Sequence, residues 1–150
     1  MKNTNSTLLV SDAVPCNYMR CILVSCPLGK SCLRNIAWRN LRSDSDAVVV
    51  VNPKLATSAD GCPYFASCIP ERYAVGFTRM QQQMFPAQYS EFMAVCRKRF
   101  GRNGYFLRRR GAVPMPPSEQ QFVRKVLDRV GVSADIAFDE YEERINWHGE

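Results

Sequence analysis

The chain has 150 residues, of which 46% are hydrophobic and 23% charged, and its formal net charge is +6. A chain of this length buries roughly 70% of its surface on folding, so we expect one globular domain over 16–150 after a flexible N-terminus over 1–15. Ordinary apolar content without low-complexity runs excludes a disordered chain, a collagen-like repeat and a coiled coil.

The first half of the chain is predicted to contain an irregular segment, a helix and a strand. A Cys-Pro pair and a glycine interrupt 16–32, which is typical of irregular structure. Apolar residues at helical spacing predict a helix over Ser31–Leu41. Ala47–Val51 consists largely of valines and is followed by Asn52-Pro53, so it predicts a short strand buried on both faces.

The next segment is predicted to contain two strands around a long helix. Alternating apolar residues predict a half-buried strand over Arg72–Thr78. Pro86 suits the opening turn of a helix, and Gly101 suits the position just past its end. Asn103-Gly104 then predicts a turn, and the β-forming residues of Tyr105–Arg109 predict a third strand.

The last elements are predicted to be helices. Ser118 and Gln121 have the spacing of a capping box, which predicts a helix that ends at Gly131. Apolar residues among acids in Ile136–Trp147 predict a short packed helix. The fold class is therefore α+β: a small three-stranded sheet packed by three to four helices, with a Cys-rich irregular N-terminal segment.

The charge is divided unevenly along the chain. Residues 1–134 contain 19 Lys and Arg against 8 Asp and Glu, a net +11, whereas 135–150 contain one Arg against 6 acids, a net −5. A basic body favours nucleic acid, an anionic surface or an acidic partner. The acidic end would either screen that basic surface or lie in solvent.

No segment has the length of an export signal or a membrane span. The longest aliphatic run is Ala47–Val51, against the ~20 apolar residues that a spanning helix needs. The N-terminal apolar run, Leu8–Val10, is shorter than the ~7 residues of a signal-peptide core. We therefore expect a cytoplasmic protein without a membrane partner. Thiols stay reduced there, so we interpret the seven cysteines as metal ligands or buried thiols.

The cysteines are clustered in a repeated pattern. Cys26-Pro27 and Cys62-Pro63 each open a C-P-x4-C element, and these elements end at Cys32 and Cys68. Clustered thiolates suit Zn²⁺, which binds four of them tetrahedrally at about 2.3 Å. The only histidine is His148, so histidine ligation is nearly excluded.

We predict a structural zinc site with four thiolate ligands, which are Cys21, Cys26, Cys32 and Cys62. Cys96 lies on the apolar stripe of a predicted helix and is expected in the core, and Cys16 and Cys68 are reserves. Spacings of four and five residues are not diagnostic of zinc. Reduced thiols without metal, an iron–sulfur cluster and oxidised pairs therefore stay open as alternatives.

Several short motifs together resemble a family of small uncharacterised bacterial proteins of unknown function. They are Cys21, Cys26-Pro27, Cys32-Leu33-Arg34, Val51-Asn52-Pro53, Cys62-Pro63-Tyr64-Phe65, Arg72-Tyr73-Ala74-Val75-Gly76-Phe77 and Phe100-Gly101-Arg102. The resemblance covers most of the chain from about Cys21 onward. It implies no activity and no catalytic residues, but it favours Cys26 and Cys62 over Cys68 as ligands.

A basic segment lies between residues 97 and 110. Its seven cations, with no acid among them, are Arg97, Lys98, Arg99, Arg102, Arg108, Arg109 and Arg110. Arginine matches phosphate oxygens in pairs, and the interleaved Phe100, Tyr105 and Phe106 would stack on unpaired bases. The other interpretation is a solvated basic face that serves solubility or a protein partner.

These features predict a binding protein rather than an enzyme. The sequence has no GxSxG, P-loop, HExxH or dinucleotide glycine motif, and a Cys–His pair would need the terminal His148. The leading hypothesis is a small cytoplasmic binding module with a four-cysteine structural metal site that contacts nucleic acid through the basic segment. The alternative is a protein-interaction module whose basic surface docks an acidic partner.

Overall fold

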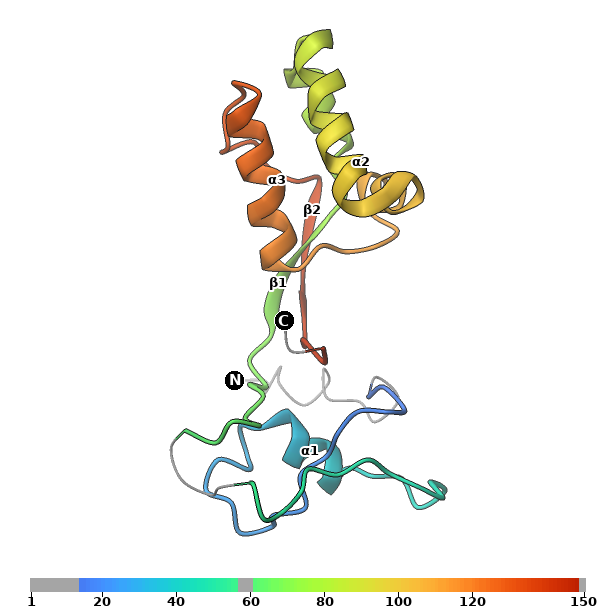
Figure 1. Cartoon of the computed structure of the whole chain (residues 1–150), viewed down its shortest axis with the longest axis vertical. Coiled ribbons are helices and arrows are strands. Elements are labelled where there is room, and N and C mark those ends of the chain that lie inside the picture. The colour runs from blue at the N-terminus through green and yellow to red at the C-terminus, as the bar shows by residue number, and fades with distance from the viewer. Residues whose placement is uncertain (1–13, 57–60, 149–150) are drawn as a thin grey trace, which may run out of the picture. The chain divides into compact units, whose positions relative to one another are not determined.

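The computed structural model describes residues 14–56 and 61–148. These residues form two compact units (Figure 1). The cysteine-rich unit comprises the described residues between 14 and 70 together with 145–148, and the helical unit is Glu71–Arg144. The single domain over 16–150 stays a prediction, and residues 1–13 of the expected flexible N-terminus lie outside the described residues.

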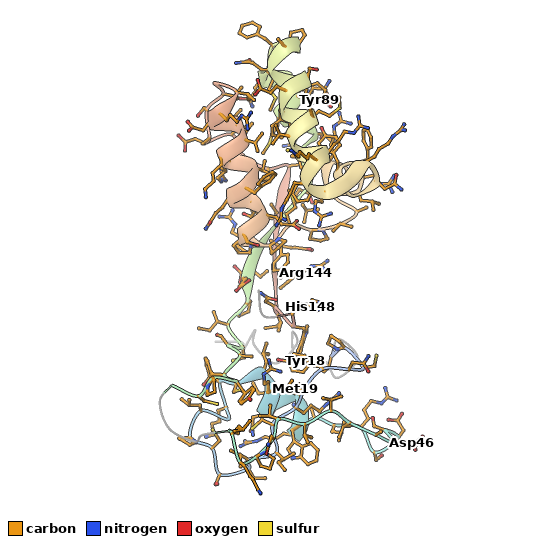
Figure 2. The ribbon with its side chains drawn as sticks, viewed as in Figure 1. Tyr18, Met19, Asp46, Tyr89, Arg144 and His148 are labelled. Atoms are coloured by element: carbon orange, nitrogen blue, oxygen red, sulfur yellow. The ribbon has the colours of Figure 1, made fainter. Side chains whose placement is uncertain are left out.

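The cysteine-rich unit is built around one short helix, α1 (Leu33–Arg39), within the predicted range Ser31–Leu41. Its small apolar cluster consists of Tyr18, Leu33 and Ala37, with Val14, Ala66, Cys68, Ile145 and Trp147 packed against it. The ring of Tyr18, labelled in Figure 2, lies edge-on to Trp147 with centroids 5.1 Å apart. The rest of this unit's described backbone is irregular and pairs only through isolated bridges.

The helical unit contains β1 (Glu71–Val75), the 3-10 helix η3 (Thr78–Gln83), α2 (Pro86–Arg109), α3 (Pro117–Arg129) and β2 (Glu140–Arg144). The two strands pair antiparallel, and α3 lies against β1 and α2 (Figure 1). Mixed helix and strand content is thus confirmed. No helix among the described residues is long and apolar enough to cross a membrane.

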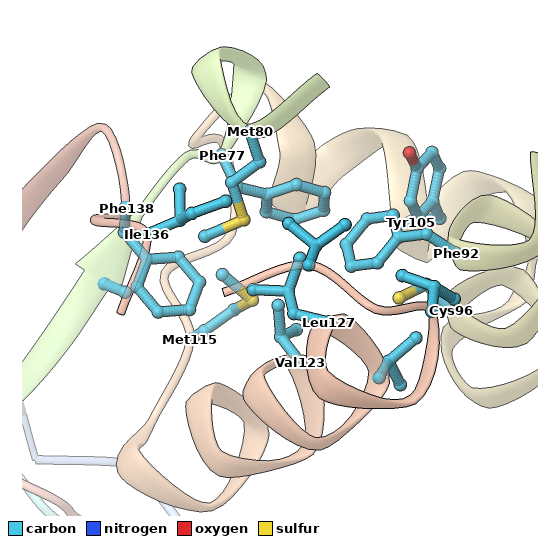
Figure 3. Packing of buried hydrophobic residues seen from close by; sticks show 14 residues of the cluster. Phe77, Met80, Phe92, Cys96, Tyr105, Met115, Val123, Leu127, Ile136 and Phe138 are labelled. Carbon is cyan, nitrogen blue, oxygen red and sulfur yellow. The ribbon is translucent and has the colours of Figure 1, made fainter. Parts of the chain in front are cut away.

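The core of the helical unit lies between these elements (Figure 3). The ring of Phe77 is edge-on to Phe92 and Tyr105, with centroids 6.1 and 5.6 Å away. Cys96 is fully buried beside them, which confirms its predicted place in the core. Burial raises the pKa of the Cys96 thiol to about 12, so it stays protonated at neutral pH.

The predicted strand over Ala47–Val51 is wrong. Its only pairing among the described residues is one bridge between Val50 and Arg20. Val49 and Val50 are 46% and 39% exposed, so the valines are not buried on both faces. A valine-rich run forms a stable strand only where neighbouring strands supply a hydrogen-bonded ladder, and this segment has no such neighbours in the described chain.

The predicted turn at Asn103-Gly104 and the strand over Tyr105–Arg109 are also wrong, because both belong to α2. Gly101 takes a φ of 72°, in the left-handed region that favours glycine, so it kinks the helix. After the kink, the second part of α2 places Tyr105 in the same buried core as Cys96. Tertiary packing overrides the β propensity of this segment.

The predicted helix over Ile136–Trp147 contains a strand instead. In the register of β1 and β2, Glu71 faces Arg144 and Arg72 faces Glu143, so opposite charges stand across the pair. The guanidinium of Arg72 lies 3.8 Å from the ring centroid of Tyr141. The acids Glu140, Glu142 and Glu143 are therefore cross-strand neighbours of β1. The described sheet has two strands rather than the three predicted.

The start of α3 differs from its prediction. The helix begins at Pro117 with Pro116 as its N-cap and has no side-chain cap, so the capping box of Ser118 and Gln121 does not form. Instead, Gln120 donates to the carbonyls of Arg72 and Met115 and ties α3 to β1. The end of α3 just before Gly131 agrees with the prediction.

Asp139 joins the segment before β2 to the start of η3. Its carboxylate accepts hydrogen bonds from the N–H and hydroxyl of Thr78, both at 2.7 Å, and from the N–H of Arg79 at 3.1 Å. Burial alone raises the pKa of Asp139, but these hydrogen bonds outweigh it and lower the pKa below its ordinary value. Asp139 thus acts as a cap supplied by a distant part of the chain.

We predict that Asp139→Ala lowers the free energy of unfolding by about 0.5–2 kcal/mol at neutral pH, as for the loss of a helix cap. Because the folded-state pKa is depressed, this stabilisation is present above the unfolded pKa and is lost as pH falls through the folded value. Urea denaturation at pH 7 and in acid measures both effects. An equal loss in the exposed variant Asp135→Ala would contradict the capping role.

Candidate functional site

Four cysteines of the cysteine-rich unit line one cavity of about 20 Å³. They are the four predicted ligands, Cys21, Cys26, Cys32 and Cys62. The other lining side chains are mostly apolar: Leu23, Leu28, Asn35, Ala56, Tyr64 and Phe65. Cys16, Cys68 and Cys96 do not line it, so the fold separates the predicted ligands from the other three cysteines.

Equivalent turns bring two of these cysteines to the cavity. The carbonyl of Cys26 accepts a hydrogen bond from the N–H of Gly29 at 3.0 Å, and that of Cys62 accepts one from Phe65 at 3.1 Å. Each turn has proline at its second position, where the fixed φ of proline favours a tight turn. The repeated Cys-Pro pair in the sequence therefore corresponds to a repeated turn.

The ends of the two C-P-x4-C elements lie side by side. Cys32 forms an antiparallel bridge with Ser67, and the N–H of Cys68 donates to the carbonyl of Ser31 at 3.1 Å. Only Cys32 lines the cavity, because Cys68 packs against the apolar cluster around Tyr18. Cysteines in equivalent sequence positions thus have different surroundings.

Asn35 is a buried polar residue of the cavity that the sequence analysis missed. It is 1% exposed, and its amide donates to the carbonyls of Cys21 at 3.2 Å and Leu23 at 2.9 Å. Its Oδ1 atom has no hydrogen-bond partner, and a Cβ at position 29 would lie 2.6 Å from that oxygen. The only available signal was an asparagine within the predicted helix, next to its apolar positions.

The thiols surround the cavity without converging on one point. Within residues 14–56 and 61–148, no three Cys, His, Asp or Glu side chains are arranged to hold a metal ion. Two other residues that could bind a metal lie outside this cavity: Cys16 is exposed, and His148 lines a separate depression with Tyr18 and Trp147. Zinc, an iron–sulfur cluster and metal-free thiols therefore all stay predictions.

The basic segment forms the second half of α2 and its C-cap. Its exposed cations are Arg97, Lys98, Arg99, Arg102 and Arg110, of which Arg99 has its guanidinium 5.9 Å from the ring centroid of Phe122. No salt bridge engages any of the five within the described part of the chain. Their charges are therefore not neutralised by ion pairs among the described residues.

Arg108 and Arg109 are engaged within the protein. Arg108 forms a two-pronged ion pair with Glu119 of α3, with both N–O distances 2.7 Å, and its guanidinium lies 4.5 Å from the ring centroid of Phe100. The hydrogen bond with Glu119 raises the pKa of Arg108 against the opposing effect of burial. Arg109 donates to Gln81 at 2.6 Å. Both arginines therefore contribute to the fold.

The aromatic residues of this segment differ in exposure. Tyr105 is fully buried, and Phe100 is half-buried edge-on against Phe122. Phe106 is 39% exposed and lines a depression of about 250 Å³ together with Asn103, Leu107 and Arg110. Of the three predicted stacking residues, Phe106 is the one whose ring lies at the surface, and it does so beside an exposed cation.

We predict that Arg108→Gln lowers the free energy of unfolding by about 1.5–3 kcal/mol, because it removes charged hydrogen bonds and leaves Glu119 without its partner. Chemical denaturation followed by circular dichroism measures this loss. Arg102→Gln is the matched control, since it removes the same charge from an exposed position of α2. Equal stability of the two variants would show that the ion pair does not hold α2 to α3.

Comparison with known proteins identifies a family but no activity. The model of a family of unknown function, DUF6078, matches residues 1–147. No curated protein and no solved structure matches the chain. The expected membership of an uncharacterised family is thereby confirmed, while a bacterial source stays a prediction. Because the match extends over nearly the whole chain, the chain belongs to the DUF6078 family of unknown function.

Proposed function

We propose that this chain is a small binding module whose cysteine-rich unit is held together by a structural zinc ion bound to Cys21, Cys26, Cys32 and Cys62. The observation that carries the proposal is that these four cysteines, and none of the other three, line the same cavity. They come from two separate stretches of the chain, 21–32 and the turn that begins at Cys62. A shared ligand would explain why these segments meet at one place.

The chemistry of the cavity suits one small cation. Its volume of about 20 Å³ is close to the space that a single water molecule needs, so an organic cofactor does not fit. Four thiolates in an apolar surrounding repel one another unless a cation neutralises them, and Zn²⁺ does so at about 2.3 Å from each sulfur. Binding requires rotation of the thiols toward the centre of the cavity.

The cysteine-rich unit also needs stabilisation beyond its core. Its only described helix has seven residues, and its apolar cluster contains three buried side chains. Small units with few buried apolar residues are usually supported by disulfides or a metal. The proposed zinc ion would supply this support, and the proposal involves no catalytic step.

We predict that reduced protein purified without chelator contains about one zinc per chain, as four-thiolate ligation requires. Cys26→Ser and Cys62→Ser should lose the metal and lower the melting temperature, because metal binding is coupled to folding. Elemental analysis by mass spectrometry measures zinc and iron together. Folded wild-type protein that contains neither metal would contradict the proposal. Stoichiometric iron in place of zinc would also contradict it and would favour an iron–sulfur cluster.

The pair Cys32→Ser and Cys68→Ser provides a matched control. The two cysteines end equivalent elements, yet only Cys32 lines the cavity. The Cys32 variant should lose zinc, whereas the Cys68 variant should keep it even if its melting temperature falls. Equal zinc loss in both variants would show that unfolding, rather than ligation, controls the metal content.

We further propose that the module binds single-stranded nucleic acid through the exposed cations of α2. The specific observation is the depression in which Phe106 and Arg110 lie together, since a ring offers stacking to a base and a guanidinium offers a phosphate contact. An acidic protein partner would use the cations alone. The unpaired Arg97, Lys98 and Arg102 would add phosphate contacts along the same helix.

We predict that affinity for a single-stranded oligonucleotide falls with salt, with a log–log slope of about −0.7 per phosphate contact. Replacing Arg97, Lys98, Arg102 and Arg110 with Gln should flatten this slope. Phe106→Leu should weaken binding about fivefold to a hundredfold through lost stacking and leave the slope unchanged. Fluorescence anisotropy at several salt concentrations measures both parameters.

Two outcomes would contradict the nucleic-acid proposal. One is the absence of binding by the wild type at low salt. The other is an unchanged salt dependence of binding in the variant with all four cations replaced, provided that its melting temperature equals that of the wild type. A different result would favour the protein-interaction alternative. In that case an acidic protein of equal charge would displace the oligonucleotide, and Phe106→Leu would not change the affinity.

A further inference from the structure

The cysteine-rich unit contains a second, larger cavity of about 250 Å³ on another side of α1. Its polar lining residues are Cys16, Arg20, Asn40, Arg42 and Ser45. Among the residues that the structure describes, no aspartate or glutamate lines it. The described wall of the cavity therefore contains two cationic side chains, Arg20 and Arg42, together with neutral hydrogen-bonding groups.

Arg20 is the most unusual of these residues, because it is a charged side chain that is only 7% exposed. Its Nη1 atom donates to the carbonyl of Tyr18 at 3.0 Å, and its Nε–H has no acceptor. No carboxylate forms a salt bridge with it within the described residues. The charge of Arg20 is therefore uncompensated by the described chain.

The backbone holds Arg20 in this place. Its N–H donates to the carbonyl of Val49 at 2.9 Å, and its carbonyl accepts from the N–H of Val51 at 2.8 Å. The segment on the other side of the bridge leads back to Ala47 and Val48, which also line the cavity. The pairing therefore forms one wall of the cavity and fixes the base of the Arg20 side chain.

A buried charge without a partner carries a large desolvation cost, and most ionisable side chains avoid that cost by shifting their pKa. Arginine does not have this option, because its guanidinium stays protonated in proteins. An anion from solution that binds the guanidinium would offset this cost. An unsatisfied buried polar group of this kind is the expected mark of an unoccupied ligand position.

We propose that this cavity binds a phosphate group, with Arg20 as its anchor. The planar guanidinium matches two oxygens of one anion, which favours an oxyanion over a halide. Arg42 lies at the exposed rim, where it pairs with Asp44 at 3.0 Å, and Asn40 and Ser45 offer hydrogen bonds. The volume accommodates free phosphate or the phosphate of a small monoester.

Isothermal titration calorimetry with inorganic phosphate, at constant ionic strength set by sodium chloride, tests this site directly. Wild-type protein should bind one phosphate per chain, and the melting temperature should rise to a plateau as the site fills. Arg20→Met should weaken phosphate binding at least about tenfold through the lost charged hydrogen bonds. Lys30→Met, which removes an exposed charge outside the cavity, should bind like the wild type.

A second variant keeps the test decisive if Arg20→Met does not fold. Ser45→Asp adds a carboxylate to the cavity wall at an exposed position, so the fold should tolerate it. This carboxylate should replace the anion: the melting temperature without phosphate should rise, and phosphate should no longer bind. Retained phosphate binding in Ser45→Asp would overturn the proposal.

Phosphate also stabilises proteins generally through exclusion from their surface. An equal rise in melting temperature for the wild type and Arg20→Met would therefore mean that the proposal is wrong, as would the absence of binding by the wild type. Titration with glycerol phosphate distinguishes the two sources of the group. Tighter binding of the ester would assign the site to a phosphorylated small molecule, and binding of phosphate alone would assign it to the free ion.

Discussion

The cysteine-rich unit depends on hydrogen bonds from the side chains of α1 to the carbonyls of the irregular segments around it. Irregular backbone near a core must find partners for its polar groups, because an unpaired buried carbonyl carries a desolvation cost. Three residues of this short helix supply five such bonds: Arg34 donates to Met19 and Tyr64, Asn35 to Cys21 and Leu23, and Arg39 to Val24. The helix therefore organises segments on both sides of it in the sequence.

This arrangement places both proposed ligands around the same helix. Asn35 lines the cysteine cavity, whereas Ala37 and Asn40 line the cavity that contains Arg20. A metal ion in the first cavity and a phosphate group in the second would each stabilise the unit by binding only its folded form. The two proposals are nevertheless separable, because zinc content depends on the thiols and phosphate binding depends on Arg20.

Sequence patterns predicted best the features that arise locally. The repeated Cys-Pro pair marks Cys26 and Cys62, two of the four cysteines that line one cavity, and alternation predicts β1. Elements that depend on distant contacts were mispredicted: Tyr105 is helical because the core buries it, and Glu140–Arg144 is a strand because β1 pairs with it. The burial of Arg20 and Asn35 could not be predicted from the sequence, because charged and amide side chains are rarely buried and no local pattern indicates such burial.

The acidic end of the chain is used within the helical unit rather than against the exposed cations of α2. Asp139 caps η3, and Glu142 pairs with Arg144 on its own strand. Glu143 stands opposite Arg72 in the β1–β2 register. Within the described residues, no salt bridge joins these acids to the basic segment. Among the described acids, Glu119 is the one that forms a salt bridge with the basic segment, and its partner there is Arg108, so the exposed cations of α2 are not neutralised by a described ion pair.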